Sequence, residues 1–128
     1  MKLRIPLSPV AKARARTVLS GGKVHSYTPE KTKGYEEQVK WLLKAARVDP
    51  LLKPTPIKVS FTFWIEQPKK SKYDWPVSKP DLDNLYKSLC DAANGILWED
   101  DSQVTTCVIC KRFAPNKGYI ELEVEEDA

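Results

Sequence analysis

The residues best suited to chemistry lie between positions 79 and 103, where acidic side chains recur at short intervals. Asp81 and Asp83 stand at the start of a predicted helix, and Asp100 and Asp101 follow that helix after a short connection. Carboxylates gathered in one place repel each other unless a cation lies among them, and such hard oxygen ligands suit Mg²⁺ or Mn²⁺ rather than zinc. A divalent cation bound there would activate water and stabilise charge on a phosphodiester. A metal-dependent nuclease site is therefore the first hypothesis.

The spacing of the charged residues predicts how they share the helix surface. Asp83, Lys87 and Asp91 recur every four residues, so they lie along one face of a helix predicted from about Leu82 to Asn94. The ammonium of Lys87 could stabilise the transition state or orient the water. The carboxylates meet only if the next strand starts near Asp101 and alongside the N-terminal end of the helix. We predict that convergence.

Each of these residues also has an ordinary structural explanation. Asp81 can cap the helix, and Asp83 can favour its positive end. Asp83 and Lys87 can form an i,i+4 ion pair, and the acidic run Glu99–Asp101 can be a solvated turn. Residue chemistry alone leaves catalysis and these structural roles both open.

The charge of the chain is divided unevenly along its length. The net charge of +4 on 128 residues combines about +11 before residue 81 with about −7 from residue 81 onward. Dense Lys and Arg are the usual electrostatic footprint of a phosphate-binding surface, although a solvated, solubilising face explains them equally well. The candidate phosphate contacts are Lys12, Arg14, Arg16, Lys69, Lys70, Lys72 and Lys79.

The segment 66–79 combines lysines with Tyr73 and Trp75. A basic loop with aromatic residues can hold single-stranded or distorted nucleic acid by stacking. The same aromatic side chains could instead cover the edge of the core, and the sequence leaves both interpretations open.

The elements that must position these residues alternate between strands and helices. The pattern predicts a strand over 2–7, a basic loop or hairpin over 8–27 with a turn at Ser20–Gly22, and a helix that starts at Thr28 and Pro29. The apolar stripe of that helix is Tyr35, Val39, Leu42 and Ala46. Strands follow over 57–65, 103–113 and 118–125, the first two separated by the 82–94 helix. The fold class is α+β: a single domain over 1–128, with two main helices packed on a mixed sheet.

The cysteines and the single histidine carry weaker functional signals. Cys107 and Cys110 would point to opposite faces of a strand, so they do not suit a metal or redox pair. Cys90, near the polar edge of the second helix, is a candidate reactive thiol, and His25 is expected at the surface or against DNA. No apolar run is long enough to span a membrane, and three cysteines favour a reducing cytoplasm over a secreted disulfide framework.

Two stretches of the chain resemble a known family. Lys79-Pro-Asp-Leu-Asp-Asn-Leu-x-Lys87, Asp91-Ala, Asn94-Gly and Asp100-Asp-x-Gln-Val104 are similar to the signature of the RusA-type Holliday junction resolvases. Pro9, Lys12, Arg14 and Arg16, followed by Tyr27-Thr-Pro and Tyr35-Glu-x-x-Val39, resemble the opening of phage and prophage members. The resemblance spans residues 5 to 104, most of the chain.

The resemblance implies a homodimeric, Mg²⁺-dependent endonuclease that resolves four-way DNA junctions by paired nicks during recombination and repair, in the cytoplasm at the nucleoid. By position, Asp81 and Asp83 match the paired metal ligands, Asp101 or its neighbour Asp100 the third, and Lys87 the supporting lysine. The alternatives are a non-catalytic, DNA-binding prophage relic and a metal-dependent nuclease for other branched DNA or for RNA.

Overall fold

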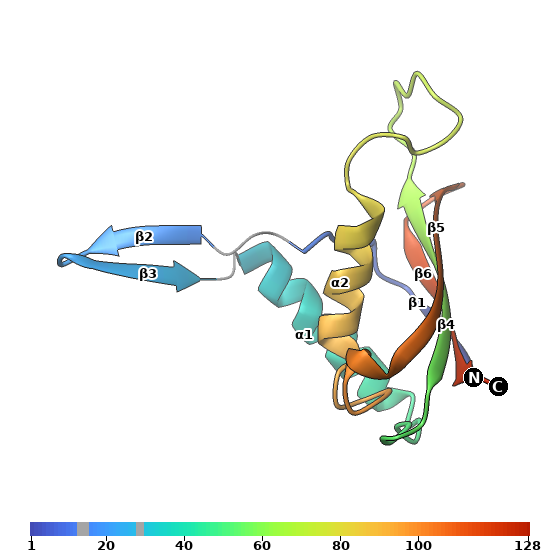
Figure 1. Cartoon of the computed structure of the whole chain (residues 1–128). Coiled ribbons are helices and arrows are strands. Elements are labelled where there is room, and N and C mark those ends of the chain that lie inside the picture. The colour runs from blue at the N-terminus through green and yellow to red at the C-terminus, as the bar shows by residue number, and fades with distance from the viewer. Residues whose placement is uncertain (13–15, 28–29) are drawn as a thin grey trace.

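A four-stranded mixed sheet forms the body of the protein. The computed structural model describes residues 1–12, 16–27 and 30–128. The strands lie in the order β1 (Lys2–Ile5), β6 (Tyr119–Glu126), β4 (Ile57–Glu66) and β5 (Val104–Ala114). β4 and β5 are parallel and the other neighbours are antiparallel. The helices α1 (Glu30–Ala45) and α2 (Leu82–Ala93) lie on one side of the sheet (Figure 1). The predicted α+β class, mixed sheet and two helices are confirmed.

Strand β4 shows how the sequence creates a core on one face of the sheet. Its apolar residues Ile57, Val59, Phe61 and Phe63 are at most 1% exposed, and the residues between them are partly or fully accessible. This alternation follows from the two-residue period of a strand. Burial of each such side chain stabilises the fold by about 1.5–3 kcal/mol. The opposite face carries no helix in Figure 1.

The buried face of α1 differs in part from the predicted stripe. Tyr35 and Val39 are buried as expected, but Leu43 is buried where Leu42 was predicted, and Leu42 is only half-buried. Leu43 lies closer in angle to Val39 and to the buried Thr32 than Leu42 does, because a helix advances 100° per residue. Ala46 is exposed because it follows the last helical residue.

A separate hairpin projects from the body of the molecule (Figure 1). Strands β2 (Arg16–Ser20) and β3 (Lys23–Tyr27) pair only with each other. Gly21 and Gly22 join them with φ values of 58° and 77°, a conformation that two-residue hairpin turns require and glycine adopts readily. The predicted hairpin is confirmed, whereas the helix start predicted at Thr28 and Pro29 lies outside the described residues.

Helix α2 is the element that positions the acidic residues. Its inner face buries Leu85, Leu89, Ala92 and Ala93, and it ends at Ala93 with Asn94 as its C-cap, one residue before the predicted end. The connection to β5 includes the short 3-10 helix η1 (Asp101–Gln103). β5 starts beside the C-terminal end of α2 and runs back along it (Figure 1). Neither α1 nor α2, nor any other helix in the described ranges, is long and apolar enough to cross a membrane.

Candidate active site

Two carboxylates stand exposed at the N-terminal end of α2. Asp81 occupies the N-cap position with an extended backbone, but its side chain makes no capping hydrogen bond. Asp83 lies in the first turn, and both residues are exposed. The structural explanation for Asp81, a side-chain cap, is therefore wrong. Both carboxylates have oxygen atoms available for a ligand.

Lys87 stands one turn after Asp83 on the same helix face and is exposed. The ion pairs found among the described side chains all involve Lys12. The Asp83–Lys87 ion pair, which was the structural explanation for these two residues, is therefore not formed. An unpaired ammonium near unpaired carboxylates is free to contact a phosphate oxygen.

Lys12 is engaged by carboxylates rather than presented to solvent. Its Nζ lies 2.6 Å from Glu36 and 3.2 Å from Asp91, and its backbone N–H donates to the carbonyl of Asn84. Partial burial by itself would lower the pKa of Lys12, but hydrogen bonds and charges from Glu36 and Asp91 raise it. The network ties the N-terminal segment to α1 and α2. It gives Asp91 a structural partner and Lys12 a role other than the predicted phosphate contact.

Asp100 caps η1. Its carboxylate accepts a hydrogen bond from the backbone N–H of Ser102, and Gln103 completes a capping box by accepting from the N–H of Asp100. The hydrogen bond from Ser102 lowers the pKa of Asp100. Asp101, the next residue, has no such hydrogen bond in the structure. Of the two candidates for a third ligand, Asp101 is the one with a free carboxylate.

Asp101 lies toward the C-terminal half of α2, near Cys90 and Asp91. Burial raises the pKa of the Cys90 thiol to about 12, and the nearby charges of Asp101 and Asp91 act in the same direction. Cys90 is only 1% exposed. Its predicted reactivity is therefore wrong, because a buried thiol that resists ionisation is a poor nucleophile.

The predicted convergence of Asp81 with Asp101 does not occur within one chain. Lys111, not Asp101, reaches the N-terminal end of α2, where its Nζ donates to the carbonyls of Ser78 (3.0 Å) and Pro80 (2.9 Å). Lys111 follows Val104 by seven positions along β5, about 23 Å of strand at 3.3 Å per residue. Accordingly, the described side chains contain no group of three or more His, Cys, Asp or Glu placed to hold a metal ion.

Basic and aromatic side chains crowd the loop that leads into α2. Lys69, Lys70, Lys72 and Lys79 are all exposed. Tyr73 and Trp75 are 56% and 58% exposed, and the guanidinium of Arg112 lies 4.8 Å from the centre of the Trp75 ring. These exposed rings do not cover the core, so that explanation of the loop is wrong. An apolar cavity of about 300 Å³ lies beside them.

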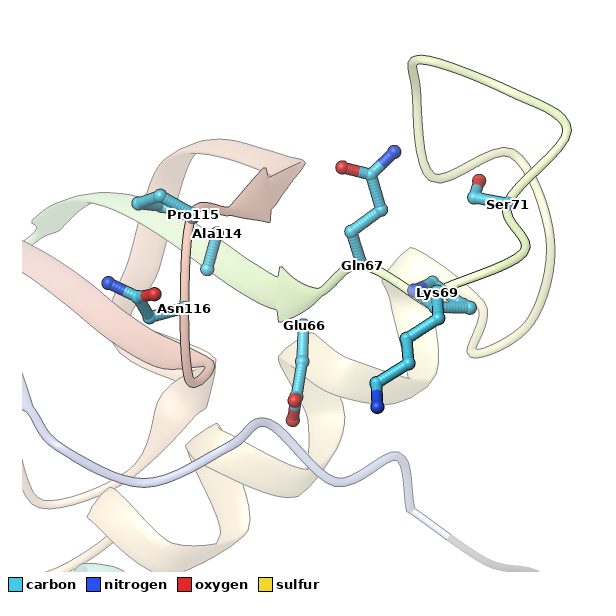
Figure 2. A pocket seen from close by; sticks show the side chains of 8 residues that line it. Glu66, Gln67, Lys69, Ser71, Ala114, Pro115 and Asn116 are labelled. Carbon is cyan, nitrogen blue, oxygen red and sulfur yellow. The ribbon is translucent and has the colours of Figure 1, made fainter.

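A second, polar cavity of about 490 Å³ opens between this loop and the β5–β6 turn. Figure 2 shows Glu66 and Lys69 on one side of it and Asn116 on the other. None of the predicted aspartates lines it. The cavity extends the polar surface near the start of α2 but is not the predicted acidic site.

The structure does not describe the side chains of two predicted phosphate contacts, Arg14 and Arg16. Arg14 lies outside the described residues, and Arg16 is described only as the first residue of β2. Arg112 was not predicted, although Lys111 and Arg112 form a basic pair within the acidic half of the chain. These two residues reach the loop before α2 because of the direction in which β5 runs, and the sequence alone does not give that direction.

The fold and the exposed carboxylates define a small α+β protein with a basic loop beside an acidic helix start, a combination suited to phosphodiester chemistry. The family model of the endodeoxyribonuclease RusA matches residues 6–125. The chain is also 35% identical over 108 residues to a crossover junction endodeoxyribonuclease of Lactococcus phage r1t, covering 82% of this chain and 80% of that protein. It is 28% identical to the protein YqaN of Bacillus subtilis (strain 168), over 98% of this chain and 96% of that protein. The chain belongs to the RusA endodeoxyribonuclease family.

Proposed function

We propose that this protein is a Mg²⁺-dependent endonuclease that resolves four-way DNA junctions by paired nicks. The observation that carries the proposal is the free carboxylate of Asp81, an N-cap residue that caps nothing, in a member of the RusA family. The relative from phage r1t, named as a crossover junction endodeoxyribonuclease, supports the same substrate class. The setting would be recombination and repair on DNA in the cytoplasm.

The side chains at the start of α2 fit a hard divalent cation. Mg²⁺ is typically held by one or two carboxylates together with water, and Asp81 and Asp83 offer two exposed carboxylates close in sequence. Within one chain Asp101 lies far from the start of α2, so we propose that it is the third ligand by way of a homodimer, in which the second copy supplies it. Mn²⁺ would be able to replace Mg²⁺. When bound, the cation would supply a water of lowered pKa and stabilise charge on the phosphate.

The residues of the chain have separate roles in the proposed reaction. Asp81 and Asp83 accept the positive charge of the cation and fix its place at the helix start. Lys87 donates to a phosphoryl oxygen as negative charge develops there. Lys111 holds the loop carbonyls of Ser78 and Pro80, and so keeps the segment before Asp81 in position.

DNA contacts are proposed on the loop 67–80. Lys69, Lys70, Lys72 and Lys79 present four positive charges to a phosphate backbone. Tyr73 and Trp75 offer faces on which unpaired bases at a junction can stack. Arg14 and Arg16 remain proposed contacts on the hairpin side.

The test is a cleavage assay on three labelled substrates: a four-way junction, a linear duplex of the same sequence and an RNA hairpin. With Mg²⁺ we expect symmetric cuts in the junction only, and none with EDTA. Cleavage of the duplex or the RNA at the same rate would point to a broader nuclease. Junction binding with no cleavage under any metal would show a binding protein without catalysis.

A further inference from the structure

The apolar cavity of about 300 Å³ lies between the loop that precedes α2 and the ends of two core strands. Ile65 of β4 and Phe113 of β5 line it from the sheet, and Tyr73 and Trp75 line it from the loop. Both loop rings are more than half exposed. Rings exposed to this extent contribute little to the core and are available to stack on a ligand.

The ring of Trp75 is supported on one side and open on the other. The guanidinium of Arg112 lies 4.8 Å from the ring centre, and Arg112 Nη1 donates to the carbonyl of Lys111, which holds the guanidinium in place. Trp75 lines the cavity and Arg112 does not, so the ring face that Arg112 leaves open borders the cavity. A ring held in this way is a rigid platform for stacking, and it loses little conformational entropy when a ligand binds.

Hydrogen bonds within the loop keep the cavity formed. The hydroxyl of Ser71 donates to the carbonyl of Tyr73 (2.8 Å), and the backbone N–H of Val77 donates to the carbonyl of Trp75 (2.8 Å). The two hydrogen bonds that Lys111 donates to loop carbonyls fix the segment that follows. A cavity that exists before the ligand arrives does not have to be assembled at the expense of binding energy.

The charges around the cavity define the class of ligand. Among the described residues that line it, three are exposed lysines, Lys70, Lys72 and Lys79, and one is a carboxylate, Glu66. An apolar, aromatic cavity with a positive surround suits a flat ring attached to an anion, which is the chemistry of a nucleotide. A volume of about 300 Å³ lies at the lower end of the range for small-molecule pockets, and so has room for one nucleobase rather than several.

The cavity adjoins the start of α2. Lys79 lines it and stands two residues before Asp81, so the Cα atoms of these two residues are at most about 7.6 Å apart. Successive nucleotides of a stacked strand are about 3.4 Å apart along the helix axis. A base in the cavity and a phosphate at Asp81 would therefore belong to the same strand, about two or three nucleotides apart.

We propose that the cavity takes one unpaired nucleobase, stacked on Trp75, from the DNA strand whose phosphate lies at Asp81. The inference deepens the proposed function and rests on it for the strand that is cut, whereas the base site can be tested by binding alone. A base in a regular duplex must first leave its pair and its stack, at a cost that is smallest for a base already unpaired. The cavity therefore selects branched or distorted DNA over a regular duplex.

The first test measures DNA binding in EDTA, where metal-dependent cleavage is blocked. A labelled duplex is compared by fluorescence anisotropy with the same duplex carrying one bulged nucleotide. We expect the bulged duplex to bind about tenfold more tightly, the scale of one base stacked on an aromatic ring. An abasic nucleotide in the bulge should remove the gain. Equal affinity for the perfect and bulged duplexes, or a gain that the abasic bulge keeps, would overturn the base site.

A substitution at Trp75 tests where the base is held. Trp75→Ala should bind the bulged and perfect duplexes equally, whereas Trp75→Phe should keep most of the gain because it keeps an aromatic face. Trp41→Ala is the matched control, since Trp41 is 69% exposed on α1, outside the loop, and this variant should bind every duplex as wild type does. Unchanged circular dichroism shows that each variant is folded. A gain that survives in Trp75→Ala would overturn the proposal.

Lys72→Ala separates the charge of the loop from its ring. We expect this variant to bind the perfect and bulged duplexes more weakly by the same factor, because a phosphate contact acts on any DNA. In wild type, raising the salt concentration should weaken binding to both duplexes and leave their ratio unchanged. A gain for the bulged duplex that disappears with salt would show an electrostatic cause and overturn stacking in the cavity.

The position of the base is tested on the four-way junction. Abasic nucleotides are placed one at a time along the cut strand, and nicking is measured with Mg²⁺. We expect one position, within about three nucleotides of the cut, where the abasic nucleotide slows wild-type nicking about tenfold and has no further effect in Trp75→Ala. A wild-type protein that nicks the junction without such a position would overturn this inference and leave the nuclease function standing. A wild-type protein that does not nick would overturn the proposed function, and the binding comparison would still decide whether the cavity holds a base.

Discussion

The two ends of α2 carry the same type of residue in opposite circumstances. At the N-terminal end, Asp81 and Asp83 are exposed, and the structure gives their side chains no hydrogen-bond or ion-pair partner. Toward the other end, Asp91 holds Lys12 and Asp100 caps η1. A carboxylate with partners is explained by the fold it stabilises. Two neighbouring carboxylates that stabilise nothing in the fold are free to bind a cation, which is why we place the chemistry at the helix start.

The sharpest way to break this comparison is to neutralise each end separately. Asp81→Asn or Asp83→Asn should reduce junction cleavage by a hundredfold or more, on the order expected for loss of a group that stabilises a transition state. Junction binding, measured by gel shift in Ca²⁺, should be unchanged or tighter, because a negative charge near phosphate is removed. Thermal stability should not fall.

Asp91→Asn is the matched control on the same helix face. It removes one charge at the partnered end, so cleavage should stay within a few-fold of wild type. Equal loss of cleavage in Asp91→Asn and Asp81→Asn would erase the distinction between the two ends.

The neighbouring residues Asp100 and Asp101 allow the same comparison between a carboxylate with a hydrogen-bond partner and one without. Asp101→Asn should reduce cleavage nearly as much as Asp81→Asn, because Asp101 has the free carboxylate of the two. Asp100→Asn keeps an oxygen that can accept from Ser102, so cleavage should be close to wild type. Rates are compared in single-turnover assays with saturating Mg²⁺. The reverse order would make Asp100 the ligand.

The sequence predicted the elements well because their signals are local. The alternation of apolar residues marks β4, and the four-residue spacing of Asp83, Lys87 and Asp91 marks α2. The predicted meeting of Asp81 with Asp101 was wrong within one chain because it depends on which end of α2 faces the start of β5. β5 runs from the C-terminal end of α2 back to its N-terminal end, where Lys111 lies. No local sequence pattern encodes that direction. The roles of Lys12 and Asp91 were also missed, because their ion pair joins residues far apart in sequence.

A smaller effect is expected when the partnered end is disturbed. Asp91→Ala leaves Lys12 with Glu36 as its remaining ion-pair partner and loosens the link between the N-terminal segment and α2. We expect a loss of about 1 kcal/mol in the free energy of unfolding, the upper end of the range for surface ion pairs, because the Lys12 and Asp91 side chains are only 24% and 27% exposed. Urea denaturation measures it, with Asp74→Ala, an exposed loop carboxylate, as the control that should cost nothing. Raising the salt concentration should narrow the difference between Asp91→Ala and wild type.

The smallest expected effect is the pH dependence contributed by Asp100. The hydrogen bond from Ser102 lowers the pKa of Asp100, so the ionised carboxylate favours the folded state. This contribution is complete above the unfolded pKa, about 3.9, and is lost as the pH falls through the lower folded value. Asp100→Ala should therefore lower the Tm slightly at pH 7, and the difference from wild type should shrink as the pH drops below 4.

The control for Asp100 is Asp49→Ala, an exposed carboxylate to which the structure assigns no side-chain hydrogen bond. Its Tm should stay close to that of wild type, because the structure gives the Asp49 side chain no partner whose loss would destabilise the fold. If Asp100→Ala also follows wild type, its cap contributes no stability. The hydrogen bond of Asp100 would then add nothing to the free energy of unfolding. Only the ion pair of Asp91 would distinguish the carboxylates at the two ends of α2 by their contribution to stability.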